Sequence, residues 1–161
     1  VLLFQNTRAR TRTRTRACGQ VLRSPIHKWG LFTSVPIAKD TMIVEYVGQA
    51  LRNLVSDRRE ALYEDSDIGR AQGGDCYMFR LDDDTVVDAT TRGNIARFIN
   101  HSCDPNSYCK VVVVDNKKRI VIFAKRSLER YEEITYDYKF ATEKDKIECH
   151  CGAARCVGRM N

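Results

Sequence analysis

Short apolar runs that alternate with polar turns dominate this chain, and extended helical patterns are few. Residues that favour strands gather in four runs, namely 41–47, 77–81, 85–87 and 133–138. Two further runs of β-branched residues, 110–114 and 119–124, flank the polar segment 115–118 and predict a hairpin. The pattern therefore predicts a mainly β protein with many short strands.

Helical patterns are short in comparison. Residues 56–64 begin with Ser56, a candidate N-cap, and carry Arg and Glu at helical spacing, which predicts a short helix. Residues 92–99 predict a single helical turn, whereas 65–75 contain three glycines and predict a loop. A doubly wound nucleotide-binding fold is not expected, because it alternates strands with long helices and carries a phosphate-binding glycine loop.

Length and charge refine this picture. The 161 residues suffice for one domain with a real core, and the formal net charge is +6. Much of the basic excess lies in residues 1–20, where 8–16 alternate Arg with Thr or Ala and predict an unfolded basic arm. Two interpretations of this arm stay open, a contact with nucleic acid and a solvated linker. We expect no membrane span and no signal peptide, because the apolar runs are too short.

The seven cysteines are odd in number and include a C-x-C pair, which disfavours a disulfide scaffold and indicates a reducing compartment. Cys149, Cys151 and Cys156 provide three thiolates for a tetrahedral zinc ion, and Cys103 provides a fourth. Such a site would pin the C-terminal tail to the segment around Cys103, with a structural role. His150 is an alternative ligand between two cysteines, and free thiols in a loose tail are the alternative to a zinc site.

Reactive side chains concentrate in R-F-I-N-H-S-C-D-P-N, residues 97–106, which contains Asn100 and His101. Five tyrosines fall on predicted strands or beside this segment, and their functional interpretation requires a shared pocket: Tyr46, Tyr77, Tyr108, Tyr136 and Tyr138. The run H-K-W-G at 27–30 predicts a turn that is either an ordinary β-turn or a place where Gly30 lets the backbone approach a ligand and Trp29 stacks on it.

Taken together, these motifs resemble the SET domain, the fold of protein-lysine methyltransferases. The resemblance covers about residues 23–161 and includes I-H-K-W-G-L-F, V-E-Y-V-G, C-Y-M-F-R-L-D, V-V-D-A-T, R-F-I-N-H-S-C-D-P-N, I-T-Y-D-Y-K-F and C-H-C-G-A-A-R-C. The details are similar to the trithorax/COMPASS class, which methylates lysine 4 of histone H3. Only Cys18 precedes the domain, unlike the cysteine-rich segments of the classes that methylate lysines 9 and 36.

The resemblance implies a role for each matching residue. It implies contacts with S-adenosyl-L-methionine from His27, Trp29, Tyr77, Asn100, His101 and His150. It implies one structural zinc ion on Cys103, Cys149, Cys151 and Cys156. It implies that Tyr46 and Tyr138 line the methyl-transfer pore, and that Tyr136 limits how many methyl groups are added.

The resemblance also implies an organisation and partners. The expected fold is a set of small curved sheets with a C-terminal pseudoknot: a SET domain at 21–140 with an insert at about 52–75, and a post-SET zinc tail at 141–161. The expected partners are the histone H3 tail and COMPASS-type subunits that contact the insert, in the nucleus. Alternatives are a methyltransferase for another lysine and a catalytically silent SET-like binding module. The chain departs from the family at Tyr131, where a small residue is usual, at Ser107, where a second cysteine is common, and in the long glycine-rich loop.

Overall fold

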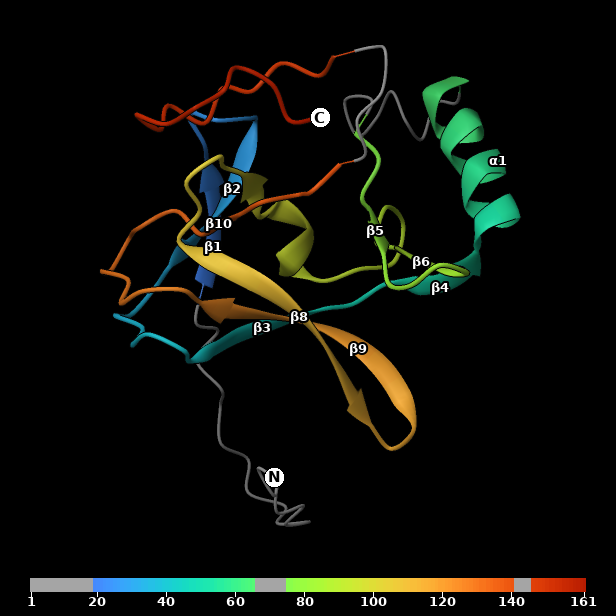
Figure 1. Cartoon of the computed structure of the whole chain (residues 1–161), viewed down its shortest axis with the longest axis horizontal. Coiled ribbons are helices and arrows are strands. Elements are labelled where there is room, and N and C mark those ends of the chain that lie inside the picture. The colour runs from blue at the N-terminus through green and yellow to red at the C-terminus, as the bar shows by residue number, and fades with distance from the viewer. Residues whose placement is uncertain (1–18, 66–74, 141–145) are drawn as a thin grey trace.

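Small β-sheets make up most of the fold in this computed structural model, which describes residues 19–65, 75–140 and 146–161. Within these ranges the strands form four separate sheets of two or three strands each, accompanied by one α-helix and one 3₁₀ turn (Figure 1). The mainly β fold predicted from the sequence is confirmed. No helix in the described ranges has the length and apolar character needed to cross a membrane.

The described chain begins with an antiparallel ribbon of β1 (Gly19–Arg23) and β2 (Trp29–Thr33). The ribbon starts two residues before the predicted boundary at residue 21. Lys28 closes the connecting turn with a φ of 35°. Leu31 on β2 is buried and joins the core of the protein, so the ribbon packs firmly against the rest of the fold.

A three-stranded sheet forms the middle of the molecule, in the order β3 (Met42–Tyr46), β9 (Lys117–Ala124) and β8 (Ser107–Val114). Its β8–β9 hairpin was predicted, but the four-residue turn was wrong. Asp115 and Asn116 alone form the turn, with φ values of 50° and 58°, while Lys117 and Lys118 pair within the sheet. Positive φ at both central residues is typical of the type I′ turn, whose twist matches that of the strands.

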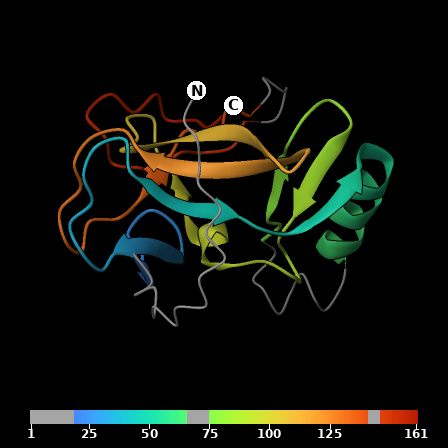
Figure 2. The ribbon, with the colours of Figure 1, turned by 90° about the horizontal axis from the view of Figure 1, so that it is seen from below.

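A second three-stranded sheet lies toward one end of the molecule, in the order β4 (Gln49–Arg52), β6 (Thr85–Asp88) and β5 (Met78–Arg80). Helix α1 (Asn53–Asp65) follows β4 directly and lies beside this sheet (Figure 2). The helix begins three residues earlier than predicted. Ser56 is therefore inside the helix and donates its hydroxyl hydrogen bond to the Asn53 carbonyl at 2.8 Å.

Asp88 at the end of β6 anchors α1 to the sheet. Its fully buried carboxylate accepts hydrogen bonds from Arg59 Nη1 at 2.9 Å and from the Tyr63 hydroxyl at 3.0 Å, both on α1. The backbone N–H of Thr90 donates a third bond at 2.9 Å. Burial alone would raise the pKa of Asp88, but the hydrogen bonds outweigh it and lower the pKa below its usual value.

The last two strands, β7 (Asn100–His101) and β10 (Thr135–Tyr136), pair in parallel, and the 3₁₀ turn Ile95–Phe98 precedes them. Only these two residues of the strand predicted at 133–138 pair as a strand. Parallel neighbours need a crossover, and the β8–β9 hairpin lies within it. Ile99 and Ile134, which precede the two strands, are buried in the core. The pairing places the chain beyond β10 beside the Asn100–His101 segment, as expected for the pseudoknot.

Candidate functional site

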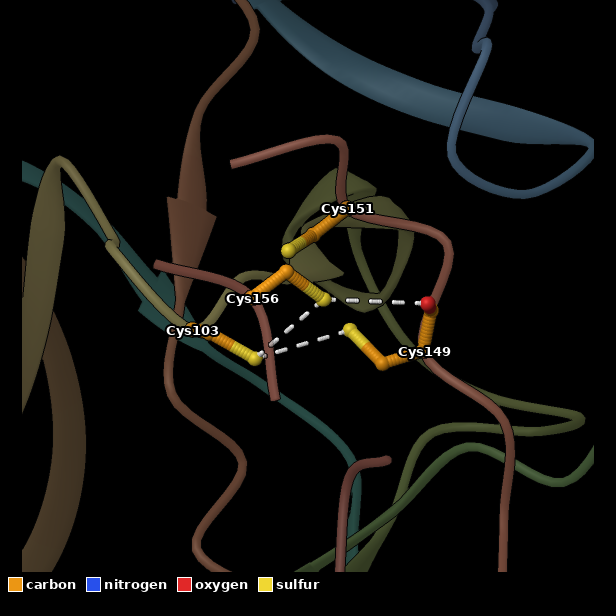
Figure 3. A group of neighbouring side chains, drawn as sticks. All are labelled: Cys103, Cys149, Cys151 and Cys156. Atoms are coloured by element: carbon orange, nitrogen blue, oxygen red, sulfur yellow. Dashed lines mark hydrogen bonds between the residues drawn. The ribbon is translucent and has the colours of Figure 1, made fainter. Parts of the chain in front are cut away.

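Four cysteine side chains converge on one point, as Figure 3 shows. The Sγ atoms of Cys103, Cys149, Cys151 and Cys156 all lie within 4.8 Å of one another. Cys103 Sγ is 3.7 Å from the Cys149 sulfur and 3.8 Å from the Cys156 sulfur. Thiolates bound tetrahedrally at about 2.3 Å from zinc are themselves roughly 3.8 Å apart. The sequence-predicted ligand set is thus brought together, and two of its Sγ distances match the spacing of a tetrahedral zinc site.

The local backbone of the tail presents these sulfurs. Cys149 N donates to the Gly158 carbonyl at 3.1 Å, and Gly152 and Gly158 have φ values of 66° and 77°, which favour glycine. Burial raises the pKa of Cys149 to about 12. At Cys151 burial also raises the pKa, but hydrogen bonds from the backbone N–H groups of Cys103 and Ala153 outweigh it and lower the pKa to about 6. A bound cation would draw all four groups toward the thiolate form.

His150 does not join the sulfur cluster. Its side chain is 66% exposed, and its Nε2 lies 3.6 Å from a carboxylate oxygen of Glu148. The alternative of His150 as a zinc ligand therefore finds no support in the geometry. The residue does lie next to Cys149, and the cluster holds this part of the tail beside Cys103, two residues beyond His101.

Aromatic rings form a continuous row through the centre of the fold. Ring centroids are separated by 5.2 Å between Tyr46 and Phe79, by 5.7 Å between Phe79 and Tyr136, and by 4.8 Å between Tyr136 and Tyr138. Phe140 continues the row at 5.2 Å from Tyr138. The structure thus brings together Tyr46 and Tyr138, which were predicted to line the pore, and Tyr136, which was predicted to limit the number of methyl groups added. The sequence interpretation missed Phe79 and Phe140, although both belong to motifs quoted above, C-Y-M-F-R-L-D and I-T-Y-D-Y-K-F.

Two of these tyrosines donate hydrogen bonds from their hydroxyls to backbone carbonyls. Tyr138 donates to the Ile99 carbonyl at 2.9 Å, and Tyr46 donates to the Tyr77 carbonyl at 3.2 Å. Burial raises the pKa of Tyr46, Tyr136 and Tyr138 well above the usual value, because the phenolate loses its hydration. These three groups therefore stay protonated near neutral pH and cannot act as strong bases.

Tyr77 and Tyr108 have different surroundings. Burial raises the pKa of Tyr77 to about 12, and its ring packs edge-on against Phe98. Tyr108 is stacked on Phe123 at 5.7 Å and is 38% exposed. Tyr77 thus lies next to the aromatic row through its contact with Tyr46, whereas Tyr108 has its ring contact with Phe123 of the neighbouring strand.

His101 links the row to the cysteine cluster. Its buried Nδ1 accepts a hydrogen bond from the Tyr138 backbone N–H at 3.2 Å, and its ring lies 5.4 Å from the Tyr138 ring. Its Nε2 is 3.6 Å from Cys103 Sγ. Burial lowers the pKa of His101, so the neutral ring that accepts from Tyr138 is favoured. His101 therefore fixes the position of Tyr138.

Asn100 connects the paired strands β7 and β10 to the turn between β1 and β2. Its Nδ2 donates to the carbonyl oxygens of His27 at 3.4 Å and Trp29 at 3.0 Å. The predicted residues His27, Trp29 and Asn100 thus meet through the backbone of the turn. The guanidinium of Arg23 lies 4.2 Å over the half-exposed Trp29 ring. A Cβ added at Gly30 would collide with Glu133 Oε1, so the close approach that this glycine permits is to a carboxylate of the same chain.

Comparison with known proteins agrees with this geometry. The family model described as the SET domain matches residues 28–139, and the chain belongs to the SET domain family.

The chain is also similar to several proteins named as histone-lysine N-methyltransferases. The chain is 54% identical over 139 residues to "Histone-lysine N-methyltransferase SETD1B" of Homo sapiens, a match that covers 86% of this chain and 7% of that protein. It is equally 54% identical over 139 residues to "Histone-lysine N-methyltransferase set-2" of Caenorhabditis elegans, with 86% of this chain and 9% of that protein covered. "Histone-lysine N-methyltransferase SETD1" of Drosophila melanogaster is 52% identical over the same length, covering 86% of this chain and 8% of that protein. The chain therefore spans less than a tenth of these relatives.

Proposed function

We propose that this chain is a protein-lysine N-methyltransferase that uses S-adenosyl-L-methionine and acts on lysine 4 of the histone H3 tail. The observation that carries the proposal is the convergence of Tyr46, Tyr136 and Tyr138 in one buried aromatic row. The names of the relatives support the reaction class. The similarity to the trithorax/COMPASS class supports the choice of lysine.

The chemistry of these side chains suits a lysine substrate. An amine attacks only when neutral, and free lysine has a pKa of about 10.4. Burial that keeps the tyrosines protonated also disfavours an ammonium among them, so it would lower the pKa of an inserted lysine. Because these phenols are not bases, their role is to exclude water and to orient the amine.

Tyr138 and Tyr136 have separate tasks in this proposal. Tyr138 is held by His101 and by the Ile99 carbonyl, and it orients the reacting groups. The Tyr136 hydroxyl makes no hydrogen bond within the described residues although the residue is buried. We propose that this hydroxyl holds a water molecule or the substrate amine and so limits the number of methyl groups added.

The cofactor would supply an electrophilic methyl group bound to a sulfonium. Asn100 fits a role in binding it, because its Oδ1 accepts no hydrogen bond from the described residues while its Nδ2 is fully occupied. We propose His27, Trp29, Tyr77, Asn100, His101 and His150 as its contacts. Zinc fits the four cysteines and would hold the tail against the segment that contains Asn100, His101 and Cys103.

Helix α1 supports the proposal of partner subunits. Leu54 and Leu62 are 80% and 65% exposed, and Val55 is also exposed. Large apolar side chains in such a group are typical of a surface that a partner covers. We propose that COMPASS-type subunits bind this insert. Of the loop predicted at 65–75, residues 66–74 lie outside the described residues.

The remaining assignments are proposals from the sequence and the relatives. We propose the divisions 1–20, 21–140 and 141–161, and a nuclear location. Residues 1–18 of this arm lie outside the described residues, and contact with nucleic acid is a proposal for them.

Methyl transfer to peptides tests the function. We expect mass spectrometry to show methylation of an H3-tail peptide, with partner subunits added if needed, and none when lysine 4 is replaced by arginine. Tyr138→Phe should abolish transfer, whereas Tyr108→Phe, which changes a tyrosine on the exposed surface, should retain it. If no peptide is methylated even with partners, the silent SET-like module is the better interpretation. Equal methylation of the arginine peptide would indicate another target lysine.

A further inference from the structure

The carboxylate of Glu133 lies directly beside the Asn100 side chain. Its Oε1 is 2.8 Å from Asn100 Nδ2. The Ser24 hydroxyl lies 2.8 Å from Oε1 and 3.0 Å from Oε2 of the same carboxylate, and it is 3.1 Å from Asn100 Nδ2. Three side chains from distant parts of the sequence thus form a closed triangle of hydrogen bonds. Neither Glu133 nor Ser24 was a candidate site residue on the sequence alone.

This triangle determines which way the Asn100 amide points. Its Nδ2 faces oxygen acceptors only, which are Ser24 Oγ, Glu133 Oε1 and the carbonyls of His27 and Trp29. If the amide were rotated by half a turn, its carbonyl oxygen would face a carboxylate and two carbonyls without a hydrogen between them. The Oδ1 atom is therefore held on the opposite side, where it accepts no hydrogen bond from the described residues.

The charge of Glu133 is not neutralised by a cation of the described chain. Its hydrogen-bond partners are a hydroxyl and an amide, and no described Lys, Arg or His forms an ion pair with it. A carboxylate that accepts from the Nδ2 hydrogens polarises the amide and makes Oδ1 a better acceptor. It also favours a ligand that brings positive charge close by.

The fold makes space for this carboxylate. A Cβ at Gly30 would collide with Glu133 Oε1 and would lie 3.0 Å from the Ser24 Cβ. Strand β2 therefore accommodates the triangle only because residue 30 is glycine.

We propose that Glu133 and Ser24 are positioning residues for methyl transfer. They hold the Asn100 amide so that Oδ1 accepts a hydrogen bond from a positively charged group of the cofactor. The amino group of S-adenosyl-L-methionine is a donor of this kind. This inference rests on the proposed function, because it takes S-adenosyl-L-methionine as the ligand. The two residues act through Asn100 and need not touch the cofactor.

Ligand binding by two near-isosteric variants, Glu133→Gln and Ser24→Ala, tests the proposal. Calorimetry would compare S-adenosylhomocysteine, which has the amino group, with methylthioadenosine, which lacks the whole amino-acid part. We expect each variant to bind S-adenosylhomocysteine about fivefold more weakly, because a charge-assisted bond is lost, and methylthioadenosine less than about twofold more weakly. Ser24→Thr keeps the hydroxyl and should restore affinity. Glu45→Gln, which changes a carboxylate paired with Arg119 in another sheet, is the control and should bind both ligands like the parent chain.

Two outcomes would overturn the positioning role. Equal weakening of both ligands would mean that Glu133 only supports the fold, and affinities equal to those of Glu45→Gln would mean that it has no role. A measurement without ligand tests the positioning role separately from the proposed methyltransferase function. NMR should show slow hydrogen exchange of the Asn100 side-chain NH₂ and clearly faster exchange in Glu133→Gln. If neither ligand binds the parent chain, the proposed function fails, while unchanged exchange in the variant would refute the positioning role independently.

Discussion

Replacing Asp88 by asparagine should loosen helix α1 from its sheet. The substitution preserves shape and removes only the charge and one acceptor. The buried carboxylate receives two donors from α1 at one oxygen and the Thr90 N–H at the other. In either orientation the new NH₂ group faces at least one donor, so a buried bond is lost and a polar group is left unsatisfied.

The magnitude follows from these contacts. Leaving a buried polar group unsatisfied costs about 1–3 kcal/mol, and losing the charge opposite Arg59 adds to it. We expect the free energy of unfolding to fall by about 3 kcal/mol. For a chain of this length that corresponds to a decrease in the melting temperature of about 6–12 °C.

Urea and thermal unfolding at neutral pH would measure this loss, with Asp57→Asn as the matched control. Asp57 is an exposed carboxylate of the same helix, and its replacement should change stability by less than about 0.5 kcal/mol.

The pKa of Asp88 is lowered in the folded state. Its contribution to stability is therefore fully present above the unfolded pKa of about 3.9 and is lost as pH falls through the folded pKa. The stability difference between parent and variant should therefore shrink in acid. A difference that is below about 0.5 kcal/mol at neutral pH, or that does not depend on pH, would refute the anchoring role.

Three further substitutions test other parts of the structure. Tyr136→Phe removes a hydroxyl that has no hydrogen-bond partner within the described chain and should raise the number of methyl groups added; an unchanged product distribution by mass spectrometry would contradict its limiting role. Cys151→Ser should lose the zinc ion and loosen the tail; stoichiometric zinc measured by elemental analysis would show that the ligand set is wrong. Tyr131 has a φ of 66°, and Tyr131→Gly should raise the free energy of unfolding by about 0.5–1 kcal/mol, measured by urea titration. Equal or lower stability would mean that the contact between the Tyr131 ring and Arg130 compensates for the strained backbone.

Local spacing allowed several features to be predicted. The C-x-C-x4-C pattern determines how the tail can present its sulfurs, because a tetrahedral ion accepts only a narrow range of loop geometries. The β8–β9 hairpin was predicted because β-branched runs flank a polar turn. Its two-residue turn was missed, since Lys117 and Lys118 appear polar in sequence yet pair along an exposed end of the sheet.

Other features depended on contacts between distant segments. Helix α1 begins at Asn53 because it continues directly from β4, whereas Ser56 offered a better local cap signal. The strand predicted at 133–138 shortens to Thr135–Tyr136 because its pairing partner β7 has only two residues. Local propensity cannot indicate how long a partner strand will be.

By itself, the sequence determined the class of fold and the C-x-C-x4-C motif of the tail, because these depend on residue type and on short spacings. The roles expected for Tyr46, Tyr136 and Tyr138 came from the resemblance to the SET domain, and only the tertiary structure brought these tyrosines into one row. The tertiary structure alone decided what surrounds Asn100. Ser24 and Glu133 are separated by 109 residues in the sequence. They meet only because the parallel strands β7 and β10 lie against the turn between β1 and β2. A hydrogen bond between such residues leaves no periodic trace in the chain, so only the folded backbone reveals it.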